Sequence, residues 1–184
     1  NGVSRMQKLQ MATQEGENVR VYAIKGNFDD AQTGVKRIFA DSAFNDKLHE
    51  NGVFLSSANS INWGRLAPQI VYYVSAYCDL LKENDITLGE TVDVTVPTGN
   101  FGNIFAAYIA KRMGLPIGTL ICASNKNNIL TDFLNTGVYD RNRTFYTTMS
   151  PSMDILISSN LERLLYLIAG PEKTASYMKK LSET

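Results

Sequence analysis

The sequence has 184 residues, of which 44% are apolar, and its 18 basic residues balance its 18 acidic residues. This length allows one domain, 1–184, with a sizeable core, and the zero net charge argues against a nucleic-acid partner or an anionic membrane surface, since both favour a basic excess. No apolar run is long enough to cross a bilayer, and the two cysteines, Cys78 and Cys122, lie in apolar stretches without disulfide or zinc spacing. We therefore expect buried free thiols, no metal site and a cytoplasmic location.

The first half of the chain predicts helices and strands in alternation. Helical apolar spacing covers residues 4–14, and the alternating β-branched stretch Val19–Ile24 predicts a strand. A helix with apolar residues at 35, 38 and 39 follows that strand. The short apolar run Val53–Leu55 predicts a second strand, and a long amphipathic helix over 66–81 comes after an intervening polar segment.

The second half repeats this order. Val92–Val96 and Thr119–Ala123 predict strands, and a helical pattern follows each of them. Ser159 and Glu162 have the spacing of a capping box for a further helix, and a final polar helix begins at Pro171. The alternation predicts an α/β fold of three αβα layers with a mainly parallel sheet. Ligands of such sheets bind beyond the carboxyl ends of the strands.

The turn after the strand at 92–96 has the composition of a phosphate-binding loop. It consists of Gly99, Asn100, Phe101, Gly102 and Asn103, and it opens a helix. Glycines let the backbone approach a ligand closely, and the first amides of a helix lack partners within it. No charged residue lies between Val94 and Ala110, so backbone N–H groups and the helix dipole would have to hold an anion here. The alternative is that the two glycines only shape a tight turn.

Two better-known phosphate loops do not fit this stretch. A Walker loop needs a lysine and a serine or threonine after its last glycine, but Asn103 and Ile104 follow Gly102. A dinucleotide-binding fold needs an acidic residue at the end of the next strand, but Ser124 and Asn125 stand there. The sequence therefore disfavours ATP, GTP and NAD as ligands.

Five stretches of the sequence resemble threonine synthase in the branch found in many bacteria and fungi, a pyridoxal phosphate enzyme of the tryptophan synthase β-like fold. They are GNFDDAQ (26–32), LSSANSINWGRLAPQ (55–69), VPTGNFGN (96–103), ICASNKNNILTDFLNTGVYD (121–140) and SPSMDILISSNLERLL (150–165). The blocks lie within residues 2–170, and their joint agreement is more specific than any glycine loop alone. The resemblance implies the large-domain portion of a fold type II pyridoxal phosphate enzyme.

The resemblance also implies two phosphate sites. The glycine loop of this family holds the phosphate of pyridoxal 5'-phosphate, which gives Gly99, Asn100, Phe101, Gly102 and Asn103 as the residues that bind the cofactor. The family binds the phosphate of its small-molecule substrate, O-phosphohomoserine, with an asparagine and an arginine six residues apart, as Asn59 and Arg65 are here. Alternatively, Arg65 is a solvated residue in the first turn of a helix, where the dipole disfavours its charge slightly.

No residue of the chain receives a catalytic role from the resemblance. The Schiff-base lysine of the family lies upstream of the matching region, and the segment that contacts the pyridine nitrogen lies downstream. Lys25 and Lys126 stand at predicted strand ends and are poor substitutes. Because the chain also opens at Asn1 within a helical pattern, we expect a fragment that is inactive alone.

The resemblance implies that the full-length enzyme converts O-phosphohomoserine and water to threonine and phosphate. A freestanding module that binds phosphorylated metabolites without catalysis is the alternative.

Overall fold

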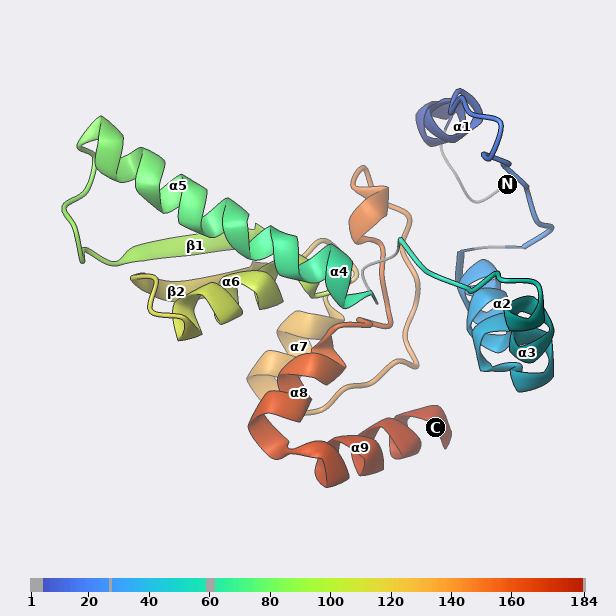
Figure 1. The fold of residues 1–184 in the computed structure, drawn as a ribbon. Helices are drawn as coiled ribbons and strands as arrows, with labels where there is room; N and C mark the ends of the chain where they lie inside the picture. The colour runs from blue at the N-terminus through green and yellow to red at the C-terminus, as the bar shows by residue number, and fades with distance from the viewer. Residues whose placement is uncertain (1–4, 27, 59–61, 184) are drawn as a thin grey trace. The chain divides into compact units, whose positions relative to one another are not determined.

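The computed structural model describes residues 5–26, 28–58 and 62–183 (Figure 1). The chain divides into two compact units, Asn1–Ser56 and Ser57–Thr184. Within the described ranges, no helix has both the length and the apolar character that a membrane span requires.

The first unit contains three described helices, α1 (Arg5–Ala12), α2 (Phe28–Ala40) and α3 (Ser42–Glu50). Asp41 caps α3, because its side chain accepts a hydrogen bond of 2.9 Å from the backbone N–H of Phe44. Such a cap satisfies one of the amides that a helix start leaves unpaired. Helices α2 and α3 also contact each other.

The two strands predicted in this unit are absent from the structure, and the prediction was wrong at these positions. Val19–Ile24 and Val53–Leu55 have no strand partner among the described residues. A strand needs a neighbour to pair its backbone groups and to cover its apolar face. Neither is provided here, since the side chains of Tyr22 and Phe54 are 84% and 75% exposed.

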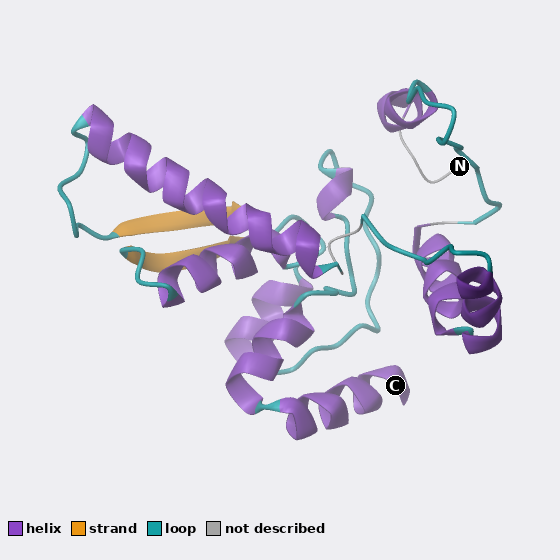
Figure 2. Ribbon diagram, in the orientation of Figure 1, coloured by secondary structure: helices purple, strands orange, loops and turns teal. Residues whose placement is uncertain are grey.

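The second unit contains the sheet and the remaining helices (Figure 2). Its elements are α4 (Trp63–Leu66), η1 (Ala67–Gln69), α5 (Ile70–Glu83), β1 (Val92–Pro97), α6 (Gly102–Arg112), β2 (Ile117–Ala123), α7 (Ile129–Thr136), η2 (Pro151–Met153), α8 (Leu161–Ala169) and α9 (Pro171–Glu183). Here η denotes a short 3₁₀ helix. The long amphipathic helix predicted over 66–81 is divided among α4, η1 and α5, since Pro68 lies within η1.

Strands β1 and β2 run parallel, which confirms the α/β class with a parallel sheet. Val94 pairs with Leu120, and Pro97 at the end of β1 pairs with Ala123 at the end of β2. Helix α6 connects the two strands and contacts both β2 and α5, while α7 contacts β2. The carboxyl ends of β1 and β2 therefore lie at the same edge of the sheet. The loop, residues 99–103, follows β1 at this edge and includes the first residues of α6.

The core of the second unit lies directly beneath this loop. Its buried apolar residues come from α4, β1, the loop, α6, α7 and α8, and they are Leu66, Val96, Phe101, Ile104, Phe105, Ala106, Ile129, Leu130 and Leu161. Phe105 is 2% exposed, and burial of such a side chain contributes roughly 1.5–3 kcal/mol. The loop is therefore fixed to this core by its own residue Phe101.

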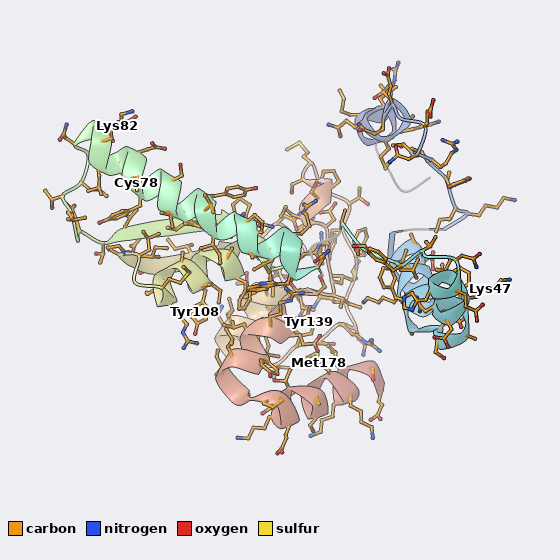
Figure 3. The ribbon with its side chains drawn as sticks, in the orientation of Figure 1. Lys47, Cys78, Lys82, Tyr108, Tyr139 and Met178 are labelled. Atoms are coloured by element: carbon orange, nitrogen blue, oxygen red, sulfur yellow. The ribbon has the colours of Figure 1, made fainter. Side chains whose placement is uncertain are left out.

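The two cysteines differ from the expectation that both are buried. Cys78 is exposed on α5 (Figure 3), and Cys122 in β2 is partly buried. Tyr77, the neighbour of Cys78 on α5, is buried and 6% exposed. Adjacent residues of a helix point in different directions, so burial of Tyr77 leaves Cys78 facing outward.

Candidate functional site

A hollow of about 340 Å³ lies at the carboxyl end of β1. The loop and the first turn of α6 line one side of it, and residues of α4, η1 and η2 line the rest. The lining residues are Arg65, Gln69, Pro97, Thr98, Gly99, Asn100, Phe101, Gly102, Asn103, Ile104, Ser152 and Met153. This volume is in the usual range for small-molecule sites. The sequence predicted a site in this position, beyond the end of a parallel strand.

Phe101 gives the loop an unusual backbone conformation. Its φ is +64°, a left-handed value that residues with a side chain rarely adopt, and it immediately precedes α6. Left-handed backbone at a residue other than glycine costs roughly 1–3 kcal/mol. The side chain of Phe101 is 6% exposed within the core, and burial of an aromatic ring offsets a cost of this size.

The backbone amides of the loop have no acceptor within the described part of the chain. No atom of the described residues accepts a hydrogen bond from the backbone N–H groups of residues 99–103. The amide of Thr98, by contrast, donates to the carbonyl oxygen of Ala123 at 2.8 Å and closes the end of the sheet. The first internal bond of α6 runs from the amide of Phe105 to the carbonyl oxygen of Phe101. Five successive amides therefore have no acceptor among the described residues.

The loop carbonyls have partners from a segment far along the chain. The hydroxyl of Ser158 donates to the carbonyl oxygen of Gly99. The carbonyl oxygen of Asn100 accepts two bonds from Asn160, at 3.1 Å from its backbone N–H and at 3.0 Å from its side-chain Nδ2. The sequence reasoning missed both residues as parts of the site. Their only signal was a run of small polar side chains, Ser158–Asn160, between two apolar stretches.

The capping box predicted at Ser159 and Glu162 is not formed. Helix α8 begins at Leu161, its N-cap residue is Asn160, and no side chain caps it. The hydroxyl of Ser159 lies 3.5 Å from Oδ1 of Asn100 instead. The residues before α8 hold the glycine loop, and this tertiary role overrides the local capping preference.

Arg65 lies on α4 and lines the same hollow as the loop. Its side chain is exposed, and no carboxylate of the described residues lies within 4.0 Å of its guanidinium. Helix α4 is fixed by Asn62, whose side chain accepts a bond of 2.9 Å from the amide of Gly64. Asn59, predicted to act with Arg65, lies outside the described residues.

Gln69 connects Arg65 to the loop. Its Nε2 donates to the backbone carbonyl of Arg65 at 3.0 Å, and its Oε1 accepts from Nδ2 of Asn103 at 3.1 Å. The hydroxyl of Tyr73 donates to Oδ1 of Asn103, and burial raises the pKa of Tyr73, so this hydroxyl stays protonated. The side chain of Asn103 is thus engaged with α5 and η1. Its backbone N–H has no acceptor among the described residues.

Gly99 packs against the wall of the hollow at a position where a side chain has no room. A Cβ at this residue would lie 3.0 Å from Cγ1 of Ile155, 3.2 Å from Cα of Met153 and 3.4 Å from the carbonyl oxygen of Ser152. Two of these three atoms are backbone. The glycine is therefore required by close packing.

The wall itself is held by Asp154. Its carboxylate accepts bonds from Nδ2 of Asn125 at 2.7 Å, from Nδ2 of Asn127 at 3.0 Å and from both the amide and the hydroxyl of Thr148. Desolvation raises the pKa of Asp154, but the bonds from Thr148, Asn125 and Asn127 outweigh it and lower the pKa overall. The ionised carboxylate thus anchors the segment around η2 to the residues that follow β2.

The charges of the hollow suit an anion and offer no general acid or base. Among the described residues, its lining contains one charged side chain, Arg65, and neither a carboxylate nor a histidine. The described residues hold no group of three side chains suited to a metal ion. Lys126 stands outside the lining, with its Nζ 5.0 Å from the ring centre of Tyr146. A guanidinium and a run of amides without an acceptor among the described residues are donors of the kind that suit an anion.

No family model matches the chain, but comparisons with curated proteins and solved structures find similar proteins. It is 56% identical over 174 residues to threonine synthase-like 1 of Homo sapiens, a match that covers 94% of this chain and 23% of the relative. It is 47% identical over 170 residues to threonine synthase of Pseudomonas aeruginosa, covering 92% of this chain and 34% of the relative. The chain thus spans about a quarter to a third of the length of these curated relatives.

Solved structures give the same result. The crystal structure of threonine synthase from Brucella melitensis with pyridoxal phosphate bound aligns with a TM-score of 0.80 and 45% sequence identity, over 99% of this chain and 37% of that one. Identity at this level over 99% of the chain reflects common descent rather than a shared fold alone. Over the part that these proteins have in common with it, the chain is therefore homologous to threonine synthases.

Proposed function

We propose that this chain is the phosphate-binding portion of a threonine synthase, which converts O-phosphohomoserine and water to threonine and phosphate. In this proposal the amides of residues 99–103 bind the phosphate of pyridoxal 5'-phosphate, and Arg65 together with Asn59 binds the phosphate of the substrate. The relatives' names and the cofactor in the Brucella melitensis structure support the assignment. A cytoplasmic location, expected from the thiols, is part of the same proposal.

The observation that carries the proposal is the row of five available amides in a hollow that Arg65 also lines. A phosphate dianion needs several donors, and each charge-assisted hydrogen bond contributes roughly 1.5–3 kcal/mol. The dipole of α6 adds about 0.3–2 kcal/mol at the same point. A neutral loop with these donors therefore fits the phosphate of the cofactor, and the nearby guanidinium fits a second phosphate.

The residues of this chain bind and orient, and we assign none of them to proton transfer. When bound, pyridoxal phosphate supplies the electron sink that makes C–H bonds of the substrate acidic. The guanidinium of Arg65 presents a planar fork to phosphate oxygens and compensates their charge. Gln69 keeps Arg65 and the loop in register through its two hydrogen bonds. The wall at Met153 packs closely against Gly99 and limits movement of the loop on that side.

Titration calorimetry with pyridoxal phosphate, and separately with inorganic phosphate, tests the binding claim. Gly102→Asp adds a carboxylate at the first residue of α6, where it suits the helix dipole but repels an anion. We expect affinity for both compounds to fall at least about ten-fold, the equivalent of roughly 1.4 kcal/mol. Gly34→Asp in α2 is the matched control, because a Cβ there meets nothing within 4 Å. Binding by neither compound to the wild-type chain would refute the proposal.

A freestanding module that binds phosphorylated metabolites is the second candidate. The donors that line the hollow among the described residues, the Arg65 guanidinium and the loop amides, are sufficient for this candidate, since binding needs no acid or base. The protein as isolated from its natural source separates the two candidates. Release of inorganic phosphate together with threonine from O-phosphohomoserine supports the enzyme, and binding without turnover supports the module.

A further inference from the structure

Ser158 and Asn160 lie against the loop although they are 59 and 60 residues away from the carbonyls they contact. Both are buried, with Ser158 6% exposed and Asn160 fully enclosed. The segment that carries them supplies three donors to two consecutive carbonyl oxygens, those of Gly99 and Asn100. Buried polar side chains of this kind are unusual, and here they act on the backbone of the proposed phosphate site.

The planarity of the peptide bond links these carbonyls to the ligand-facing amides. In a trans peptide the C=O of one residue and the N–H of the next point in opposite directions. A Gly99 carbonyl fixed on Ser158 therefore directs the amide of Asn100 away from Ser158. In the same way, an Asn100 carbonyl fixed on Asn160 directs the amide of Phe101 away from Asn160. These two amides belong to residues that line the hollow.

The orientation of the peptide groups affects anion binding more in this loop than in a loop with charged side chains. The loop has no charged side chain, so its attraction for an anion depends on which end of each peptide dipole faces the ligand. A flipped peptide would present a carbonyl oxygen to the phosphate and turn attraction into repulsion. Glycine tolerates such a flip better than other residues, and the peptide that follows Gly99 is therefore the one that needs a fixed partner.

Tyr139 holds Ser158 in place. Its hydroxyl accepts a bond of 2.8 Å from the amide of Ser158 and donates at 3.0 Å to the carbonyl oxygen of Leu156. The ring of Tyr139, labelled in Figure 3, packs edge-on against Phe133 of α7 at 5.6 Å. The contacts therefore form a chain from α7 through Tyr139 and Ser158 to the Gly99 carbonyl.

We propose that Ser158 and Asn160 are positioning residues for phosphate binding, which hold the carbonyls of Gly99 and Asn100 so that the amides of Asn100 and Phe101 face the ligand. The phosphate part of this inference rests on the proposed function. The orientation part stands by itself, because it concerns the protein before any ligand is added.

The test compares Ser158→Ala with Thr174→Val. Each substitution removes a buried hydroxyl that donates to a backbone carbonyl, and Thr174 lies in α9, where its hydroxyl bonds to Gly170 at 2.8 Å. Inorganic phosphate is titrated into each ¹⁵N,¹³C-labelled protein and followed by amide chemical shifts. We expect phosphate to bind Ser158→Ala roughly ten-fold more weakly than wild type, as loss of one well-aligned donor implies. Thr174→Val should bind as wild type does.

A third variant and a second readout separate positioning from general destabilisation. Ser158→Cys keeps a weak donor of similar size and should fall between wild type and Ser158→Ala in phosphate affinity. Without phosphate, the carbonyl ¹³C shift of Gly99 and the amide shift of Asn100 should move in Ser158→Ala and stay in Thr174→Val. The midpoints of urea unfolding show whether Ser158→Ala, Ser158→Cys and Thr174→Val remain folded.

The outcomes distinguish this inference from the proposed function. Unchanged Gly99 and Asn100 shifts in Ser158→Ala would overturn the inference, whether or not phosphate binds. Equal phosphate affinity of Ser158→Ala and wild type would overturn it as well and leave the proposed function standing. If the shifts move but wild type binds no phosphate, the orientation part holds and the proposed function fails.

Discussion

Gly99→Ala is the most direct structural perturbation of the candidate site. No positive φ is recorded for Gly99, so alanine is compatible with its backbone, and the effect of the substitution comes from contacts alone. The new Cβ would lie 3.0 Å from Cγ1 of Ile155, a side-chain atom that can rotate away. It would also lie 3.2 Å from Cα of Met153, which can move only if the segment around η2 moves.

The magnitude follows from the cost of overpacking. Ordinary carbon contacts are about 3.5–4.0 Å, so the wall or the loop must shift by a few tenths of an ångström. Insertion of one methyl group into a closely packed site typically costs about 1–3 kcal/mol. The segment around η2 resists the shift because Asp154 ties it to Asn125, Asn127 and Thr148. We expect the loop to move instead, which displaces the amides from the phosphate.

Urea unfolding and a phosphate titration measure the two consequences. We expect the free energy of unfolding of the second unit to fall by about 1–3 kcal/mol and phosphate affinity to fall about five-fold or more. Gly34→Ala is the matched control, since its Cβ meets nothing within 4 Å and alanine favours the helix by roughly 0.5–1 kcal/mol. Wild-type stability together with wild-type phosphate affinity in Gly99→Ala would refute the packing argument.

Three further changes follow from the same structure. Asp154→Asn removes a carboxylate that accepts several hydrogen bonds and should lower the free energy of unfolding by roughly 1–3 kcal/mol at neutral pH, measured by urea unfolding; a neutral midpoint like that of wild type would contradict this. The pKa of Asp154 is lowered in the folded state, so the ionised carboxylate stabilises the fold above the ordinary carboxyl pKa. This stabilisation is lost as pH falls through the lowered pKa. The difference in free energy of unfolding between wild type and Asp154→Asn should therefore shrink in acid. A thiol reagent should modify the exposed Cys78 well before Cys122, which is partly buried. Desolvation raises the pKa of Cys122, although a hydrogen bond with Thr98 opposes this effect. Equal modification rates of the two cysteines, measured by mass spectrometry, would contradict this prediction. Arg65→Lys keeps the positive charge but loses the planar fork of the guanidinium, so phosphate affinity should fall several-fold and stay above that of Arg65→Ala. Equal phosphate affinities of wild type and Arg65→Ala would show that Arg65 is not part of the site.

The sequence predicted well those elements whose signals are local. The strand at 92–96, the turn and the helix that follows it appear as β1, the loop and α6, because β-branched alternation, glycine and helical spacing each act over a few residues. Gly137 ends α7 with a φ of +75°, as a glycine after a helical pattern predicts. The position of the hollow followed from strand direction, which the alternation of elements predicts.

The failures occurred where distant partners decide the outcome. Val19–Ile24 has a strand pattern, but a strand forms only when a neighbour pairs with it, and its sequence does not identify that neighbour. The residues before α8 have a capping pattern, but Ser158 and Asn160 bond to the loop instead. Cys78 lies in an apolar stretch, yet the face of α5 to which it belongs is exposed.

The roles of Gln69 and Tyr73 could not have been predicted from local patterns either. Their contacts with Asn103 join positions 34 and 30 residues apart in the chain. Only the packing of α5 and η1 against α6 brings them together. Polar residues at such positions read as ordinary surface residues until the fold is known.

Electron density for the chain crystallised with pyridoxal phosphate tests the central claim most directly. The account predicts a phosphate group in the hollow, with its oxygens within about 3.2 Å of amides between Gly99 and Asn103. A well-ordered loop without density for the ligand, or a phosphate bound elsewhere on the chain, would contradict it.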